Sequence, residues 1–133
     1  MTTILIIEDD VIMLAAMKSI LTKSGYDVIT AKDGKEAFEK IDTEKYDLVI
    51  TDLIMPYFNG LEIVGKLRND NAKLHVGIIV VSSIGNKETI TESFRIGVDD
   101  YLKKPITANE LLSSIKNTLN KSVDQKLVTK KKK

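Results

Sequence analysis

The side chains best suited to chemistry in this 133-residue chain stand at the ends of short apolar runs. If those runs are parallel strands of one sheet, all of these side chains meet at the same edge, because the carboxyl ends of parallel strands coincide. The candidates are Glu8, Asp9 and Asp10 after residues 4–7, Asp52 at the end of 47–52, Ser82 and Ser83 where 77–82 ends, and Lys103 and Lys104 near the end of 101–103.

Such a cluster predicts a site for a hard cation and for attack on phosphorus. Several carboxylates placed together repel one another and need a cation. Oxygen ligands without His or Cys favour Mg²⁺, with water completing the octahedron. Beside that ion, a lysine and a hydroxyl, an aspartate could attack a phosphoryl group whose equatorial oxygens the metal and the ammonium neutralise.

The apolar runs have the length and composition of buried strands. They are rich in β-branched residues and do not alternate with polar ones, which is typical of strands covered on both faces, as in a parallel sheet. We expect strands at 4–7, 47–52 and 77–82, and shorter strands toward the sheet edges at 28–30 and 101–103.

The stretches between these runs have helical spacing. Thr107 with Glu110 three residues later has the spacing of a capping box and predicts the start of the last helix. Five βα units in turn predict a small α/β domain with a doubly wound parallel sheet. The expected core stripe of the first helix is Met13, Ala16, Met17, Ile20 and Leu21, and later helices are marked by Ala37, Phe38 and Ile41, by Leu61, Val64 and Leu67, by Ile90, Ser93 and Phe94, and by Leu111, Leu112, Ile115 and Leu119.

Length and composition narrow the class of protein. A chain of 133 residues corresponds to one domain that can bury a core unaided. The net charge is +1, and since lysines 130–133 carry four positive charges, residues 1–129 sum to −3, which is not the field of a nucleic-acid-binding surface. There is no cysteine, no apolar stretch near ~18 residues and no signal-peptide pattern, so we expect a soluble cytoplasmic domain. We place the domain at residues 1–121 and a basic, disordered tail at 122–133.

Five segments together resemble the response-regulator receiver domain of two-component signalling, over about residues 2–121. The resemblance implies a flavodoxin-like fold with a five-stranded parallel sheet in the order 2-1-3-4-5. Gly77 stands where Pro is common and Asn59 where Asp is common, but neither departure touches the chemistry. The segments are 4–10, 47–56, 59–62, Ser82-Ser83 and 97–105, with spacings of 43, 30 and 22 from Asp9 to Asp52, to Ser82 and to Lys104.

The resemblance implies roles in phosphoryl chemistry for several residues. Asp52 corresponds to the phosphoacceptor, and Lys104 to the lysine that pairs with it and then with the phosphoryl oxygens. Ser82 corresponds to the hydroxyl that bonds the phosphoryl group. Tyr101 corresponds to the switch aromatic that turns inward when the loop after Ser82 closes. The bond between Lys104 and Pro105 corresponds to one that is usually cis.

The resemblance also implies the ligands of Mg²⁺. Asp9 corresponds to the acid that binds the metal directly and Glu8 to its partner, which often acts through water. Asp52 and the backbone carbonyl of Ile54 complete the set of protein ligands.

Plainer interpretations exist for several of these residues and their neighbours. Asp10 is more simply the cap of the first helix, and Lys103 a surface lysine. Tyr101 could be an ordinary residue of an edge strand. His75 is interpreted as a loop residue before the fourth strand, and the lysines 130–133 as a solvated tail.

Three other functions compete with a phosphoacceptor. A phosphohydrolase of the haloacid-dehalogenase type needs a second acid two residues after the nucleophile, where this chain has Ile54. A flavin-binding electron carrier needs a hydroxyl- and glycine-rich phosphate loop where this chain has the acids 8–10. A degenerate receiver, acting only as an interaction module, would lack some of the site residues, whereas Asp9, Asp52, Ser82 and Lys104 are all present here. We therefore expect phosphotransfer onto the chain itself and slow self-hydrolysis, without turnover of a separate substrate.

The expected partners follow from that function. The phosphodonor would be a sensor histidine kinase or a histidine phosphotransfer protein, and the output a contact with a downstream protein rather than with nucleic acid. A relay shuttle, a motor-type regulator, a partner of a separate output protein and one domain of a longer regulator all stay open. We expect a monomer, with dimerisation on phosphorylation as the alternative.

Two surface features predict further properties. Val11, Ile12 and Ala15 lie away from the core stripe of the first helix, with Leu14 at its border, and could receive a four-helix phosphotransfer partner; isolated exposed aliphatics are the alternative. Ile54 and the residue two after Ser82, Ile84, cannot orient a water, so we expect a long-lived phosphorylated state.

Overall fold

Five parallel strands form one sheet in the computed structural model, which describes residues 1–56 and 58–131, with side chains through Lys121. Their order, β2-β1-β3-β4-β5, confirms the predicted doubly wound topology. The strands are β1 (Thr3–Ile7), β2 (Asp27–Ala31), β3 (Leu48–Thr51), β4 (Gly77–Ser82) and β5 (Asp100–Lys103).

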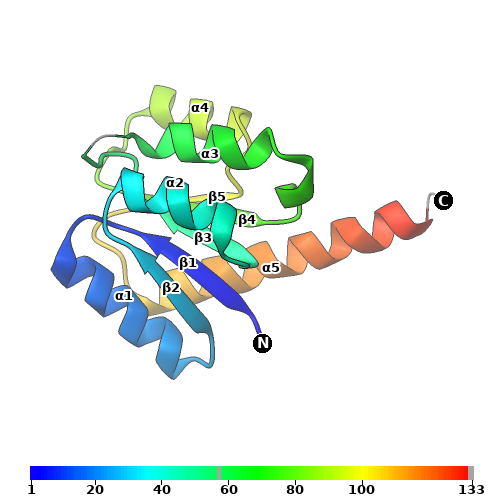
Figure 1. Ribbon diagram of the computed structural model, residues 1–133, viewed down its shortest axis with the longest axis horizontal. Coiled ribbons are helices and arrows are strands. Elements are labelled where there is room, and N and C mark those ends of the chain that lie inside the picture. The colour runs from blue at the N-terminus through cyan, green and yellow to red at the C-terminus, as the bar shows by residue number, and fades with distance from the viewer. Residues whose placement is uncertain (57, 132–133) are drawn as a thin grey trace.

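Helices cover both faces of the sheet (Figure 1). Helices α1 and α5 pack on one face, and α2, α3 and α4 lie on the other. The described helices are α1 (Val11–Lys23), α2 (Gly34–Thr43), α3 (Gly60–Arg68), α4 (Lys87–Arg95) and α5 (Ala108–Lys131), with a 3₁₀ turn, η1 (Asn71–Lys73), before β4.

The core consists of two layers, one on each side of the sheet, because alternate residues of the central strands point to opposite faces. In β1, Leu5 and Ile7 belong to the layer under α2 and α3, whereas Ile4 and Ile6 belong to the layer with α1 and α5. This two-sided burial explains why the strands read as continuous apolar runs in the sequence.

Side-chain caps set the starts of the helices. Asp10 accepts hydrogen bonds from the amides of Ile12 and Met13, which confirms it as the cap of α1. Thr107 caps α5 as predicted, since the amide of Glu110 donates to Thr107 Oγ1. The Glu110 carboxylate accepts from the Thr107 hydroxyl rather than from its backbone amide, so only half of the predicted capping box is formed. Asp33, Asn59 and Asn86 cap α2, α3 and α4 in the same way.

Two expected core residues are exposed. Ala16 faces solvent, so the buried stripe of α1 is narrower than predicted and is centred on Met17 and Leu21. Phe94 on α4 is 45% exposed, because Ser93 takes the fully buried position of that helix. In both cases the helical period places a residue beside the core, and the neighbouring layer does not extend far enough to cover it.

Helix α5 continues to Lys131, past residue 121 where we placed the end of the domain. Residues 108–131 contain no glycine or proline, so nothing in the backbone stops the helix. The disordered tail at 122–133 stays a prediction, and residues 132 and 133 lie outside the described part of the chain. Within the described residues, no helix is long and apolar enough to span a membrane.

Candidate functional site

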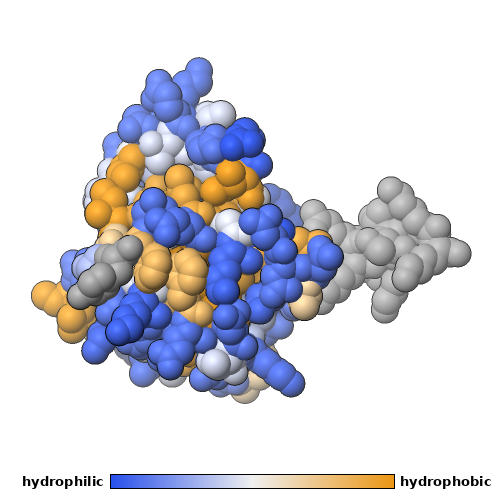
Figure 2. Space-filling view, turned by 45° about the horizontal axis from the view of Figure 1, so that its top comes forward, coloured by the Kyte–Doolittle hydropathy of each residue, from blue (hydrophilic) through white to orange (hydrophobic). Residues whose placement is uncertain are grey.

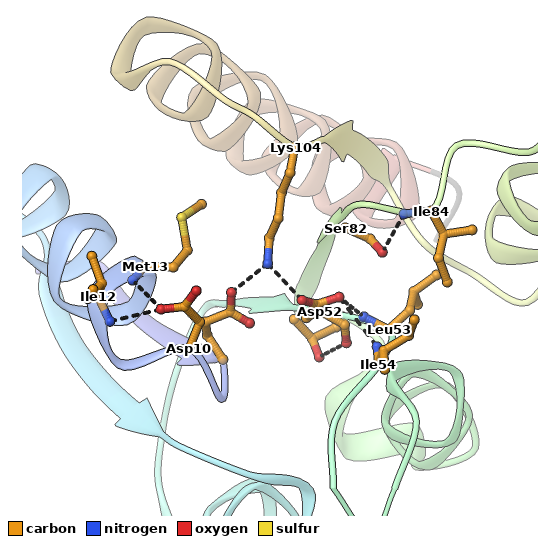
Figure 3. Close-up of polar contacts among 11 residues, drawn as sticks. Asp10, Ile12, Met13, Asp52, Leu53, Ile54, Ser82, Ile84 and Lys104 are labelled. Carbon is orange, nitrogen blue, oxygen red and sulfur yellow. Dashed lines mark hydrogen bonds and ion pairs between the residues drawn. The ribbon is translucent and has the colours of Figure 1, made fainter.

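The carboxyl edge of the sheet brings the predicted site residues together from four strands (Figure 3). Glu8 follows β1, Asp52 follows β3, Ser82 ends β4, and Lys104 follows β5. In the parallel register Ile7 of β1 pairs with Thr51 of β3, so the residues directly after them are neighbours although 44 positions separate them in the sequence.

Lys104 connects the two most buried acids of the site. Its Nζ lies 2.6 Å from Glu8 Oε1 and 2.8 Å from Asp52 Oδ2. Burial alone would lower the pKa of Lys104, but its hydrogen bonds to Asp52 and Glu8 raise the pKa above the ordinary value. The ammonium of Lys104 therefore stays charged and lies between the carboxylates of Glu8 and Asp52.

Glu8 is in an unfavourable environment. The residue is 1% exposed, and its Oε2 is buried without a hydrogen-bond partner among the described residues. Burial raises the pKa of Glu8 to about 7, and the hydrogen bond from Lys104 offsets this only in part. A buried carboxylate oxygen without a partner calls for a cation or a proton.

Asp52 is anchored by the backbone that follows it. Its Oδ1 accepts hydrogen bonds from the amides of Leu53 at 2.6 Å and Ile54 at 3.3 Å, as drawn in Figure 3. The backbone of Asp52 also lies against Gly60 at the start of α3, where an added Cβ would stand 2.2 Å from the Asp52 carbonyl oxygen. Only glycine permits this approach, which brings the first turn of α3 against the strand end.

The side of the site formed by β4 and β5 contains Ser82 and Tyr101. Ser82 is fully buried, and its Oγ accepts a hydrogen bond from the amide of Ile84 at 3.2 Å. The hydroxyl of Tyr101 donates to the carbonyl of Ile84 at 2.6 Å, and burial raises the pKa of Tyr101. Both residues therefore contact the same position of the β4–α4 loop. The bond between Lys104 and Pro105 is cis, as expected.

Three carboxylates at this edge could bind one metal ion. An oxygen from each of Glu8, Asp9 and Asp52 lies within 4.8 Å of the others, and Asp9 is exposed to solvent, from which an ion would enter. The donors are all oxygens, and the unpartnered Glu8 Oε2 needs a positive neighbour, so the residues fit a hard divalent cation such as Mg²⁺. Asp10 turns away to cap α1 and is not part of the cluster.

The chain matches the family model described as the response regulator receiver domain over residues 4–116. The protein belongs to this family. The match covers most of the chain and confirms the resemblance drawn from the sequence.

Relatives of this receiver domain are regulators. It is 35% identical over 118 residues to the chemotaxis protein CheY1 of Helicobacter pylori, covering 87% of this chain and 95% of that protein. It is 33% identical to the transcriptional regulatory protein CrdR of Helicobacter pylori and 34% identical to the alkaline phosphatase synthesis transcriptional regulatory protein PhoP of Bacillus subtilis, covering 88% and 90% of this chain. The chain spans only about half of those two, 54% and 49% of their lengths.

Solved structures agree with the family and the fold. A CheY-like receiver domain protein from Methanospirillum hungatei superimposes with a TM-score of 0.88 at 30% identity, covering 94% of this chain and 98% of that one. The response regulator TrrA from Thermotoga maritima, solved in complex with Mg²⁺ and BeF, has a TM-score of 0.79 at 32% identity, covering 90% of this chain and all of that one. That relative was thus solved with a magnesium ion, the metal to which the acidic cluster here is suited.

Sequence reasoning missed the residues that hold the described part of the β3–α3 loop, residues 53–56 and 58–59, in place. Neither Gly34 nor Gly60 is a candidate on sequence grounds, yet Gly34 lies against Phe58 and Gly60 against the backbone of Asp52 and Leu53. Phe58, which lies against Gly34, was not singled out at all. The available signal was the pair of turns Asp33-Gly34 and Asn59-Gly60, but a glycine after a cap does not by itself show what approaches it.

Proposed function

We propose that Asp52 accepts a phosphoryl group from a phosphohistidine and that the modified domain signals through its surface. The observation that best supports this proposal is the position of Lys104 Nζ, 2.8 Å from Asp52 Oδ2 and 2.6 Å from Glu8 Oε1. In the transfer, an oxygen of Asp52 forms a bond to phosphorus while the bond from phosphorus to the imidazole nitrogen breaks, and the imidazole leaves with the electron pair. Lys104 then neutralises charge on the phosphoryl oxygens.

The metal ligands we propose are Glu8, Asp9, Asp52 and the backbone carbonyl of Ile54. When bound, Mg²⁺ supplies Lewis-acid stabilisation of the phosphoryl oxygens. The short bond from the Leu53 amide at 2.6 Å orients the Asp52 carboxylate, while Lys104 contacts its other oxygen.

Signalling would start at the β4–α4 loop. The Ser82 hydroxyl, next to Asp52 at the strand edge, would donate to a phosphoryl oxygen and pull the loop inward. Tyr101 is already bonded to the carbonyl of Ile84 in that loop, so a shift at Ser82 would be communicated to the ring on β5. This makes Tyr101 the proposed switch residue, and phosphorylation would change the surface that a downstream protein contacts.

Phosphoryl transfer onto Asp52 and its later hydrolysis would be the only reactions of the domain. A sensor histidine kinase or a histidine phosphotransfer protein would supply the phosphoryl group in the cytoplasm. The acidic balance of residues 1–129 supports a protein partner rather than nucleic acid. We propose a monomer before phosphorylation, with dimerisation afterwards as a second possibility.

The phosphodonor must cover the rim of this site to bring its phosphohistidine to Asp52. Val11 and Ile12 on α1 are 76% and 82% exposed, and Ile54 is 64% exposed. In Figure 3, Ile12 and Ile54 stand on opposite sides of the Asp52–Lys104 pair. Figure 2 shows hydrophobic surface at the left rim, the side to which the carboxyl ends of the strands point in Figure 1. An apolar rim of this kind suits a helical partner that docks around the site.

The phosphoacceptor is tested by intact-mass analysis after incubation with acetyl phosphate and Mg²⁺. We expect one phosphoryl adduct in the wild type and none after EDTA treatment or in Asp52→Asn. Asp27→Asn is the matched control, because Asp27 is an exposed acid at the start of β2, the opposite end of the strands from the site. An equal adduct in Asp52→Asn, or a wild type that is not labelled, would overturn the proposal.

Donor docking is tested by Ile12→Asp, with Leu74→Asp as the matched control. Leu74 is a 52% exposed aliphatic before β4, at the other end of the strands. Ile12→Asp should slow transfer from a phosphorylated histidine phosphotransfer protein at least about tenfold while labelling by acetyl phosphate is unchanged, and Leu74→Asp should change neither. Leu14 is unsuitable for this test because it is half-buried and packs against the core. Equal transfer rates in the two variants would contradict the docking surface.

A further inference from the structure

The two described arms of the β3–α3 loop, residues 53–56 and 58–59, are joined to each other next to the phosphoacceptor. The amide of Gly60 donates to the carbonyl of Leu53 at 2.8 Å, and Ile54 forms an isolated antiparallel bridge with Asn59. At its start, the amides of Leu53 and Ile54 bond to Asp52 Oδ1. Displacement of one side of this loop is therefore transmitted across the bridge to the other side.

Phe58 attaches that loop to α2. Its ring stacks on the ring of Phe38, with 4.4 Å between the centroids and 26° between the planes. It also lies directly over Gly34, where an added Cβ would stand 2.6 Å from both Cβ and Cδ2 of Phe58. Lys66 of α3 completes the contact with its Nζ 5.6 Å from the centroid of the Phe38 ring, a cation–π arrangement.

This contact is separate from the main core. Phe38 packs against the layer of buried residues under α2 and α3, whereas Phe58 is half-buried and does not belong to either buried cluster of the described residues. Removal of the Phe58 ring therefore releases the loop from α2 without opening a cavity in the core. The stack of Phe58 on Phe38 therefore holds the loop against α2 and contributes little to the core.

We infer that Phe58 is a positioning residue for the metal site, held by Phe38 and by the bare Cα of Gly34. The inference rests on the proposed function, in which the carbonyl of Ile54 is a ligand of Mg²⁺. Phe58 precedes Asn59, and Asn59 is bridged to Ile54, so the aromatic contact sets where that carbonyl lies. Residues that orient a metal ligand without touching the metal can change its affinity about 10- to 100-fold.

Two substitutions on different elements perturb this contact from opposite sides. Phe58→Ala removes the ring, and Gly34→Ala pushes it away, because the new methyl would overlap Phe58 Cβ. Alanine has a higher intrinsic helix propensity than glycine, so a loss of helix propensity cannot explain an effect of Gly34→Ala. Phe58→Tyr keeps the ring, and Phe94→Ala removes an exposed Phe from α4, away from the site.

The experiment measures Mg²⁺ affinity by titration calorimetry and amide hydrogen exchange in the metal-free protein. In Phe58→Ala and Gly34→Ala we expect about tenfold weaker Mg²⁺ binding and about tenfold faster exchange at the amides of Ile54 and Gly60. Phe58→Tyr and Phe94→Ala should stay within about twofold of the wild type in both measurements.

The outcomes separate this inference from the proposed function. Unchanged exchange at Ile54 and Gly60 in Phe58→Ala overturns the inference, and so does faster exchange with unchanged Mg²⁺ affinity. If the wild type binds no Mg²⁺, the proposed metal site is wrong, and the proposed role of Phe58 in positioning the Ile54 carbonyl for the metal is overturned with it. If the wild type binds Mg²⁺ and Asp52→Asn is still labelled, the phosphoacceptor is wrong while the positioning role of Phe58 is supported or rejected on the two measurements alone.

Discussion

Glu8→Gln should stabilise the metal-free protein at alkaline pH. The Glu8 side chain is 1% exposed and faces Lys104 and Asp52, and its Oε2 has no hydrogen-bond partner among the described residues. Burial raises the pKa of this carboxyl from 4.5 to about 7. A glutamine keeps the shape and an acceptor for Lys104, but it removes the charge that the site must bury without metal.

The direction of this pH dependence follows from when Glu8 loses its proton in the folded and in the unfolded chain. Below pH 4.5 both the folded and the unfolded chain hold the proton, and the stability is fully present. As the pH rises toward 7, the unfolded chain releases the proton first, so the free energy of unfolding falls until the folded Glu8 is also ionised. At about 1.4 kcal/mol for each unit of pKa, the rise from 4.5 to about 7 corresponds to about 3.5 kcal/mol lost above pH 7.

Urea denaturation in EDTA at about pH 5 and about pH 8 measures this loss. The difference in unfolding free energy between Glu8→Gln and the wild type should grow in favour of the variant by about 2 kcal/mol between the two conditions. Asp9→Asn is the control, because it removes an exposed carboxylate of the same cluster and should change stability by less than about 0.5 kcal/mol. A difference that is the same at both values of pH would refute the reasoning.

Three further changes have expected outcomes. Gly60→Ala should cost about 1–3 kcal/mol of stability and slow the labelling of Asp52, because the new methyl would overlap the Asp52 backbone. Urea denaturation measures the stability and intact-mass kinetics the labelling. Labelling at the wild-type rate would contradict this prediction. Ile54→Asn should shorten the lifetime of the phosphorylated state about tenfold, since an amide at this 64% exposed position can orient a water. Decay of the phosphorylated form in Mg²⁺ measures this lifetime. An equal lifetime in the wild type and the variant argues against control of hydrolysis by Ile54. Arg68→Met should destabilise the fold by about 3 kcal/mol, because Arg68 donates hydrogen bonds to the carbonyls of Val76 and Gly97 and forms an ion pair with Asp99. Thermal denaturation tests this prediction. A loss below about 0.5 kcal/mol would show that these contacts are dispensable for stability.

Much of the fold and of the candidate site could be predicted because both depend on local patterns. Continuous apolar runs identified the buried strands, and capping residues such as Asp10 and Thr107 identified helix starts, since a cap acts within three residues of the chain. Parallel strands end at one edge of their sheet, so the polar residue after each run had to belong to the same site. That argument placed Glu8, Asp52 and Lys104 together, and the structure finds them in contact.

Contacts between elements distant in the chain were decided only by the tertiary structure. No local pattern distinguishes the buried Glu8, with its unpartnered oxygen, from the exposed Asp9 beside it, because burial depends on which layers close over the strand end. Helical spacing likewise gave the direction of the core but not its width, which is why Ala16 is exposed. The contact of Phe58 with Gly34 joins the β3–α3 loop to the start of α2, 24 residues earlier in the chain, and it exists only once the sheet has brought both to the same edge.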